Sequence, residues 1–113
     1  MPKPEKLLSN FGFKRNLTLG NYDLKEVKSS HNIIKRFDEY AYDIELTFRP
    51  RKNSNYDELY HKLLGMIKSP RIIKGIRNPY KCRIYQPYDI VELNNSDIIF
   101  YLNGHAKKVY KTQ

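Results

Sequence analysis

Apolar and polar side chains alternate most regularly between Tyr40 and Arg49. The apolar positions of this segment are Tyr42, Ile44, Leu46 and Phe48, and the polar positions between them are Asp43, Glu45, Thr47 and Arg49. A period of two predicts a strand with one face in the core and the other in water or against a neighbouring molecule. Pro50 ends the strand, because proline cannot donate to a sheet ladder.

The period changes from two to between three and four after residue 54. The apolar positions there are Tyr56, Leu59, Tyr60, Leu63, Leu64 and Ile67. Asn55 with Glu58, or Ser54 with Asp57, is typical of a capping box at a helix start. The pattern therefore predicts one amphipathic helix over about residues 55–68, which ends before Pro70.

Shorter alternating segments predict the remaining strands. They are a bent strand or short hairpin over 17–27, a strand over 80–84, a hairpin formed by 88–93 and 98–102, and a strand or frayed end over 106–110 after an Asn103-Gly104 turn. Residues 29–39 are expected to form a loop with a weak strand at 33–34. Residues 71–78 are expected to be irregular, with Ile72, Ile73 and Ile76 buried or half-buried. The predicted fold class is α+β, mainly β: an antiparallel sheet or sandwich with one packed amphipathic helix.

The first fourteen residues form a segment of different character, with two prolines and a small apolar cluster. We interpret 1–14 as an N-terminal arm and 15–113 as a single globular domain. The arm is expected to fold back on its own domain; the alternative is that Phe11 and Phe13 anchor it on a neighbouring subunit. Further candidates for a subunit interface are Asp43, Glu45 and Arg49, on the polar side of the clearest strand.

Charge suggests a class of partner. The 113 residues carry 21 Lys plus Arg and 12 Asp plus Glu, a net charge of +9, which favours a polyanionic partner. Seven bases and no acid lie between Lys62 and Arg83, and tyrosines interleave with the last of them. The candidate nucleic-acid or partner-binding residues are therefore Lys62, Lys68, Arg71, Lys74, Arg77, Lys81 and Arg83, with Tyr80, Tyr85 and Tyr88.

Motifs for catalysis and for metal binding are missing from the sequence. His31, His61 and His105 are far apart and have no metal-ligand spacing, and there is no phosphate loop or nucleophile elbow. Cys82 has the parity of a core position, which favours a buried thiol over a nucleophile. We expect no enzyme, cofactor, metal or small-molecule substrate; a ribonuclease that uses His61 or His105 with neighbouring lysines is the enzymatic alternative.

Residues 40–87 resemble the central part of phage distal-tail and related tail-tube proteins. The resemblance is carried by the alternating strand at 43–48, the helix at 56–64, and Arg77-Asn78-Pro79-Tyr80 leading into a strand at 83–85. The closing strand at 97–102, followed by a basic tail, is also similar to that family. The resemblance implies a β-sandwich flanked by one helix, with subunits assembled into a ring in a virion tail.

The first functional hypothesis is accordingly a non-enzymatic structural protein of a phage tail or connector. Its partners would be further copies of itself and other virion proteins. The alternatives are a small basic protein that binds DNA or RNA, and a phage or mobile-element protein that binds and inhibits an acidic host protein. No apolar run is long enough for a membrane helix, so we expect synthesis in the host cytoplasm and, under the first hypothesis, a place in the virion.

Overall fold

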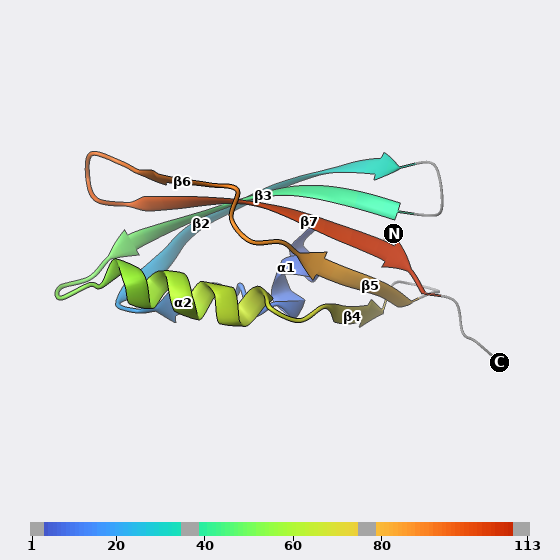
Figure 1. The fold of residues 1–113 in the computed structure, drawn as a ribbon, viewed down its shortest axis with the longest axis horizontal. Helices are drawn as coiled ribbons and strands as arrows, with labels where there is room; N and C mark the ends of the chain where they lie inside the picture. The colour runs from blue at the N-terminus through green and yellow to red at the C-terminus, as the bar shows by residue number, and fades with distance from the viewer. Residues whose placement is uncertain (1–3, 35–38, 75–78, 110–113) are drawn as a thin grey trace.

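The computed structural model describes residues 4–34, 39–74 and 79–109 (Figure 1). The elements in chain order are α1 (Pro4–Asn10), β1 (Thr18–Leu19), β2 (Tyr22–Ile34), β3 (Glu39–Pro50), α2 (Tyr56–Ile67), β4 (Arg71–Lys74), β5 (Pro79–Ile84), β6 (Asp89–Glu92) and β7 (Ile98–Lys108). Both helices lie on the same side of the long strands β2, β3 and β7 (Figure 1). The predicted fold class is confirmed, since strands dominate the chain and α2 packs against them.

All strands belong to one antiparallel sheet, so the sheet is the correct one of the two predicted architectures. The order is β1-β2-β3-β7-β5-β4, with β6 also paired to β7. On one side β7 pairs with β3, and its other side is shared by two strands: β6 faces residues 98–101 and β5 faces residues 104–108. The described residues extend over 52 × 23 × 20 Å, because β2, β3 and β7 are long and lie along one axis.

The core lies between the inner face of this sheet and the helices. The apolar residues of β3 predicted to face inward, Tyr42, Ile44, Leu46 and Phe48, are all buried. Leu59, Leu63 and Ile67 of α2 pack into the same cluster, as the helical period predicts. Asn55 caps α2 by accepting hydrogen bonds from the backbone N–H groups of Asp57 and Glu58.

The N-terminal segment contributes to the core, which corrects its interpretation as an arm outside it. Residues 4–10 form the helix α1, and Leu7, Leu8, Phe11 and Phe13 are all buried in the main apolar cluster. These four side chains complete the burial of the sheet's inner face near β2 and β4, which α1 contacts. The segment therefore folds back on its own chain, as expected in preference to the neighbouring subunit.

Three loops expected from local sequence are strands instead. Residues 29–32 continue β2 in register with residues 41–44 of β3, so the pairing outweighs their turn propensity. Residues 71–74 form β4, where Ile73 is buried but Ile72 is exposed, contrary to the expectation for Ile72. Ile76 lies outside the described residues.

The Asn103-Gly104 pair lies inside β7 and is not a turn. Gly104 pairs with Tyr42 on one side and Ile84 on the other. A Cβ atom at Gly104 would come within 3.1 Å of Ile44 Cδ1 and 3.4 Å of Leu7 Cδ2. Glycine is present here because α1 packs closely on the sheet, and this need is not visible in the local sequence.

Neither helix in the described part of the chain has the length and apolar character needed to span a membrane.

Candidate functional site

Strand β5 presents its charged residues on the outer face of the sheet, away from the helices. Tyr80, Cys82 and Ile84 are buried, whereas Lys81 and Arg83 between them are exposed. Side chains alternate between the faces of a strand, so the two cations share one face. Of the candidate residues from the sequence, Lys81 and Arg83 are thus held side by side by a regular strand.

Strand β7 adds to this face. In the register of the sheet Lys81 lies opposite Lys107, and Arg83 lies opposite His105. Residues directly opposite each other in an antiparallel pair have their side chains on the same face. The outer face at this end of the sheet therefore carries two rows of basic side chains from neighbouring strands.

A hollow of about 470 Å³ lies over these rows, and we call it the sheet-face groove. It is lined by Pro70, Lys81, Arg83, Tyr85, His105, Lys107, Lys108 and Val109. Glu39 of β3 borders the same rows, with its carboxylate 3.5 Å from His105 Nε2 and 3.4 Å from Lys107 Nζ. Lys81 and Arg83 have no acidic partner among the described residues, so the groove keeps an excess of positive charge.

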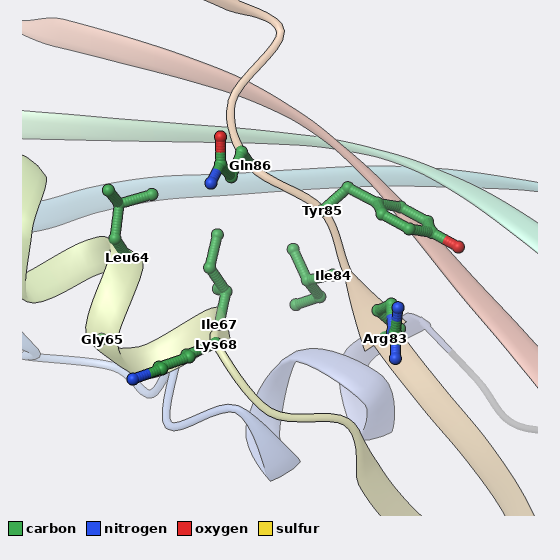
Figure 2. A pocket seen from close by; sticks show the side chains of 8 residues that line it. All are labelled: Leu64, Gly65, Ile67, Lys68, Arg83, Ile84, Tyr85 and Gln86. Atoms are coloured by element: carbon green, nitrogen blue, oxygen red, sulfur yellow. The ribbon is translucent and has the colours of Figure 1, made fainter.

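A second hollow of about 450 Å³ separates the end of α2 from β5 (Figure 2). Its lining is Leu64, Gly65, Ile67, Lys68, Arg83, Ile84, Tyr85 and Gln86. Arg83 and Tyr85 line both hollows, so the two hollows meet at these residues. Lys68, another candidate from the sequence, lines this second hollow and does not line the sheet-face groove.

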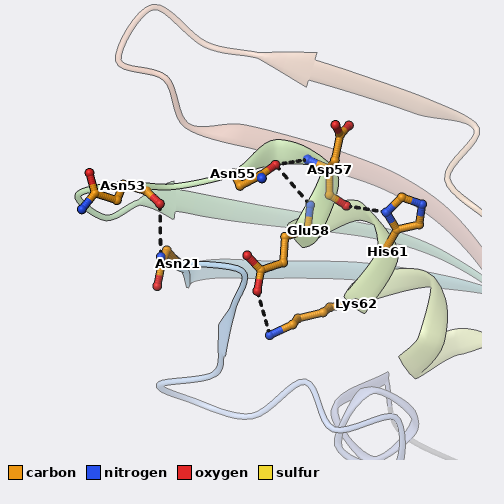
Figure 3. A network of polar contacts seen from close by, with 7 residues as sticks. All are labelled: Asn21, Asn53, Asn55, Asp57, Glu58, His61 and Lys62. Atoms are coloured by element: carbon orange, nitrogen blue, oxygen red, sulfur yellow. Dashed lines mark hydrogen bonds and ion pairs between the residues drawn. The ribbon is translucent and has the colours of Figure 1, made fainter.

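The remaining basic candidates do not gather at the sheet-face groove. Lys62 is on α2 and pairs with Glu58 at 3.1 Å (Figure 3). Arg71 lies over the ring of Phe11, with 5.7 Å between the guanidinium carbon and the ring centre, and Lys74 is exposed on β4. Arg77 lies outside the described residues.

The three candidate tyrosines have different environments. Tyr80 is buried, 5.9 Å from the ring of Tyr40, and cannot stack on an external base in this arrangement. Tyr85 and Tyr88 are exposed, and the ring of Tyr88 lies 6.1 Å from that of Tyr101. Only Tyr85 and Tyr88 therefore offer an aromatic surface to a ligand.

The candidate interface residues are also divided. Phe11 and Phe13 are 3 % and 6 % exposed, so their rings are occupied within the chain. Asp43 and Glu45 line a hollow of about 330 Å³ on the outer sheet face, together with Lys28, Ser29, Ser30, Ile44, Tyr88 and Tyr101. Arg49 is exposed near the end of β3. Two acidic candidates thus remain accessible at the centre of the sheet.

Of the residues considered for catalysis, His105 lines the sheet-face groove, whereas His61 and Cys82 lie elsewhere. His61 donates from Nδ1 to the backbone carbonyl of Asp57 at 2.8 Å, on the exposed side of α2 (Figure 3). Cys82 is fully buried, and burial raises the pKa of its thiol to about 12, so it is a protonated core residue at neutral pH. No group of three or more His, Cys, Asp or Glu side chains suited to a metal ion occurs among the described residues.

Sequence reasoning missed the β7 side of the groove. His105 was considered only as an isolated base and Lys107 only as its neighbour, because Asn103-Gly104 was interpreted as a turn. The alternation of small and polar residues over 102–108 was the available signal for a strand.

The sheet-face groove is suited to holding an anion, since cations from β5 and β7 line the same hollow. No protein-family model, curated protein or solved structure matches this chain.

Proposed function

We propose that the chain is a non-enzymatic assembly subunit of a phage tail or connector, whose copies join edge to edge into a closed ring. The observation that carries the proposal is a single sheet in which β2, over most of its length, and β4 each have one open edge; the short strand β6 also pairs only with β7 among the described strands. β1 pairs only with the start of β2, through Tyr22 and Asp23, and the hydrogen bond from Leu24 N–H to Leu17 O ends that contact. Beyond it, residues 25–34 have β3 on one side and no described strand on the other.

The opposite edge of the sheet is β4, which pairs only with β5 among the described strands. Open edges present unpaired N–H and C=O groups that can pair with another chain. Each edge also carries one accessible apolar side chain: Val27 on β2 is 36 % exposed and Ile72 on β4 is 56 % exposed. Both features are expected of surfaces that are covered in an assembly.

The two edges differ from each other, which favours a ring over a two-fold dimer. A contact between β2 of one copy and β4 of the next is heterologous, and repeated heterologous contacts close into rings when the rotation allows it. The resemblance of residues 40–102 to phage tail proteins agrees with this proposal, and we propose the virion as the location of the finished assembly.

The test blocks each edge with a charge. Val27→Lys and Ile72→Lys should each reduce the assembly to smaller species, because a lysine on an edge strand opposes strand pairing. Leu93→Lys is the matched control, since Leu93 is 39 % exposed but lies in the turn between β6 and β7. Native mass spectrometry measures the species, and circular dichroism verifies that each variant is folded.

Mixing the two blocked variants separates a ring from a dimer. Each variant keeps one intact edge of a different kind, so an equal mixture should form a heterodimer and nothing larger. If Val27→Lys alone disrupts the assembly and Ile72→Lys does not, the contact is a two-fold pairing of β2 and the ring is refuted. Loss of assembly in Leu93→Lys to the same extent would refute edge pairing altogether.

A further inference from the structure

The sheet-face groove is a second feature of the molecule, formed by β5 and β7 and not by the open edges. We propose that this groove binds single-stranded nucleic acid, with Lys81 and Arg83 on phosphates and the exposed Tyr85 stacked on a base. Nothing in this assignment depends on assembly into a ring.

The spacing of the cations is the first support. Two residues apart on one face of a strand, Lys81 and Arg83 are about 6.6 Å from each other along β5. An extended single strand has phosphates at a similar separation, so neighbouring phosphates can meet neighbouring cations. Lys107, on the next strand, widens the basic surface by one strand spacing, about 5 Å.

The fixed positions of the tyrosines are the second support. Tyr85 and Tyr88 lie in the connection between β5 and β6, yet their N–H groups donate to the carbonyls of Asn103 at 2.8 Å and Tyr101 at 2.9 Å on β7. Two hydrogen bonds to a central strand hold this connection against the sheet. Both rings remain exposed, and the ring of Tyr85 lines the groove with Lys81 and Arg83. An aromatic ring held beside a basic surface is a platform on which the bases of a single strand stack.

The Tyr85 side chain extends toward the cations of the groove. In Figure 2, Ile84 points toward Ile67 at the end of α2, whereas Tyr85 extends to the opposite side of β5. Tyr85 lines the sheet-face groove together with Lys81 and Arg83, whereas Tyr88 lies against Tyr101 in the separate hollow lined by Asp43 and Glu45. The two cations and the ring of Tyr85 therefore line one groove.

The geometry favours a single strand over the other polyanions. A duplex is read by an element that protrudes into its groove, and here the surface is a hollow over a sheet. An acidic protein would use the cations but would have no planar base for Tyr85. Asp43 and Glu45 repel phosphates from the hollow that they line with Tyr88, so the nucleic acid is expected to follow β5 and not to cross β3.

The test is fluorescence anisotropy with labelled oligo(dT) on the intact protein. Lys81→Glu and Arg83→Glu should each weaken binding by roughly tenfold or more, and the salt dependence should become shallower by about 0.7 in log–log slope for each lost phosphate contact. Tyr85→Ala should weaken binding by roughly tenfold through lost stacking. Lys62→Glu is the matched control for charge, because Lys62 is exposed on α2 and pairs with Glu58; we expect a change below about twofold.

Three results would overturn the proposal. Equal loss in Lys62→Glu and Lys81→Glu would mean that net charge alone attracts the probe. Unchanged affinity in Tyr85→Ala, or equal binding of polyglutamate, would assign the groove to an acidic protein surface. Tighter binding of a duplex of the same length would exclude a single-strand site. Lys81, Arg83 and Tyr85 are not on an open edge, so their replacement should leave the oligomeric state unchanged. Native mass spectrometry of the same variants checks this and keeps the test of nucleic-acid binding separate from the test of the ring.

Discussion

At the scale of single residues, Gly20 shows how one position holds two elements together. It occupies the turn between β1 and β2 with a φ of 55°, in the left-handed region that favours glycine. A Cβ atom there would lie 2.6 Å from the backbone nitrogen of Leu59 in α2. The turn of the first hairpin therefore packs directly on the backbone of the main helix, and only a residue without a side chain permits it.

Replacing two glycines by alanine should have effects of opposite sign. Gly20→Ala should lower the free energy of unfolding by about 2–3 kcal/mol, because the left-handed conformation and the contact with α2 both penalise a Cβ atom. Gly65→Ala should raise it by about 0.5–1 kcal/mol, since Gly65 lies in α2 with open space around its Cα. Urea unfolding of the two variants measures both changes. A stable Gly20→Ala variant would contradict the close packing of the first turn on α2.

Cys82 gives a pH dependence with a defined sign. Burial raises the pKa of the thiol from 9.0 to about 12 in the native state. Below pH 9 the thiol is protonated in both states; between pH 9 and 12 only the unfolded chain releases its proton, so stability falls as the pH rises. The loss attributable to Cys82 should approach about 1.4 kcal/mol per pH unit within this window.

The measurement compares urea unfolding at several pH values for the wild type and Cys82→Ala. The variant should lose less stability than the wild type between pH 9 and 12, although removal of the sulfur lowers its stability at neutral pH. Native protein at pH 8 should also react with a thiol reagent only after unfolding. Rapid modification of the native thiol would show that Cys82 is accessible.

At the scale of elements, the sequence predicted those parts of the fold in which local pattern and tertiary contacts agree. The alternation over 42–48 and the helical period over 56–67 are both realised, since each buries one face against the other. The predictions of secondary structure were wrong where contacts between distant segments of the chain determine the structure. Residues 29–32 become a strand only through their pairing with β3, and Gly104 continues β7 because α1 requires a small residue there.

Contacts between distant segments also limited the prediction of the candidate site. Lys81, Arg83 and Tyr85 could be placed on one face of a strand from the alternation over 80–85. The position of β7 beside them could not be predicted, because the β5–β7 pairing joins residues that are 20 to 28 positions apart in the chain. Lys62 was grouped with Lys74 and Lys81 by closeness in sequence, but it lies on α2 and therefore on another surface. Lys74 lies on the outer face of β4, the strand next to β5, but does not line the groove.

The cap of α2 provides a prediction at this scale. Asn55→Ala should lower the free energy of unfolding by about 1 kcal/mol, because the first N–H groups of the helix lose their acceptor. Asn55→Asp keeps an acceptor at the same position and should retain most of the stability. The two variants are compared by urea unfolding. Equal losses in both would mean that the side chain of Asn55 does not cap the helix.

At the scale of the whole molecule, the sheet has a covered inner face, a charged outer face and open strand edges at β2, β4 and β6. The helices and the N-terminal residues bury the inner face within one chain, so a further subunit is not needed to complete the core. The edges are different: residues 25–34 of β2 and the whole of β4 lack a described neighbour on one side. In the assembly that we propose, neighbouring copies cover these edges while the groove on the outer face stays accessible.

The most direct test of this account is native mass spectrometry of the wild-type protein beside Val27→Lys and Ile72→Lys, with negative-stain images of the wild type. We expect the wild type to form one discrete oligomer that appears as a closed ring, and each blocked variant to lose it. A wild type that remains monomeric at high protein concentration would contradict the assembly role.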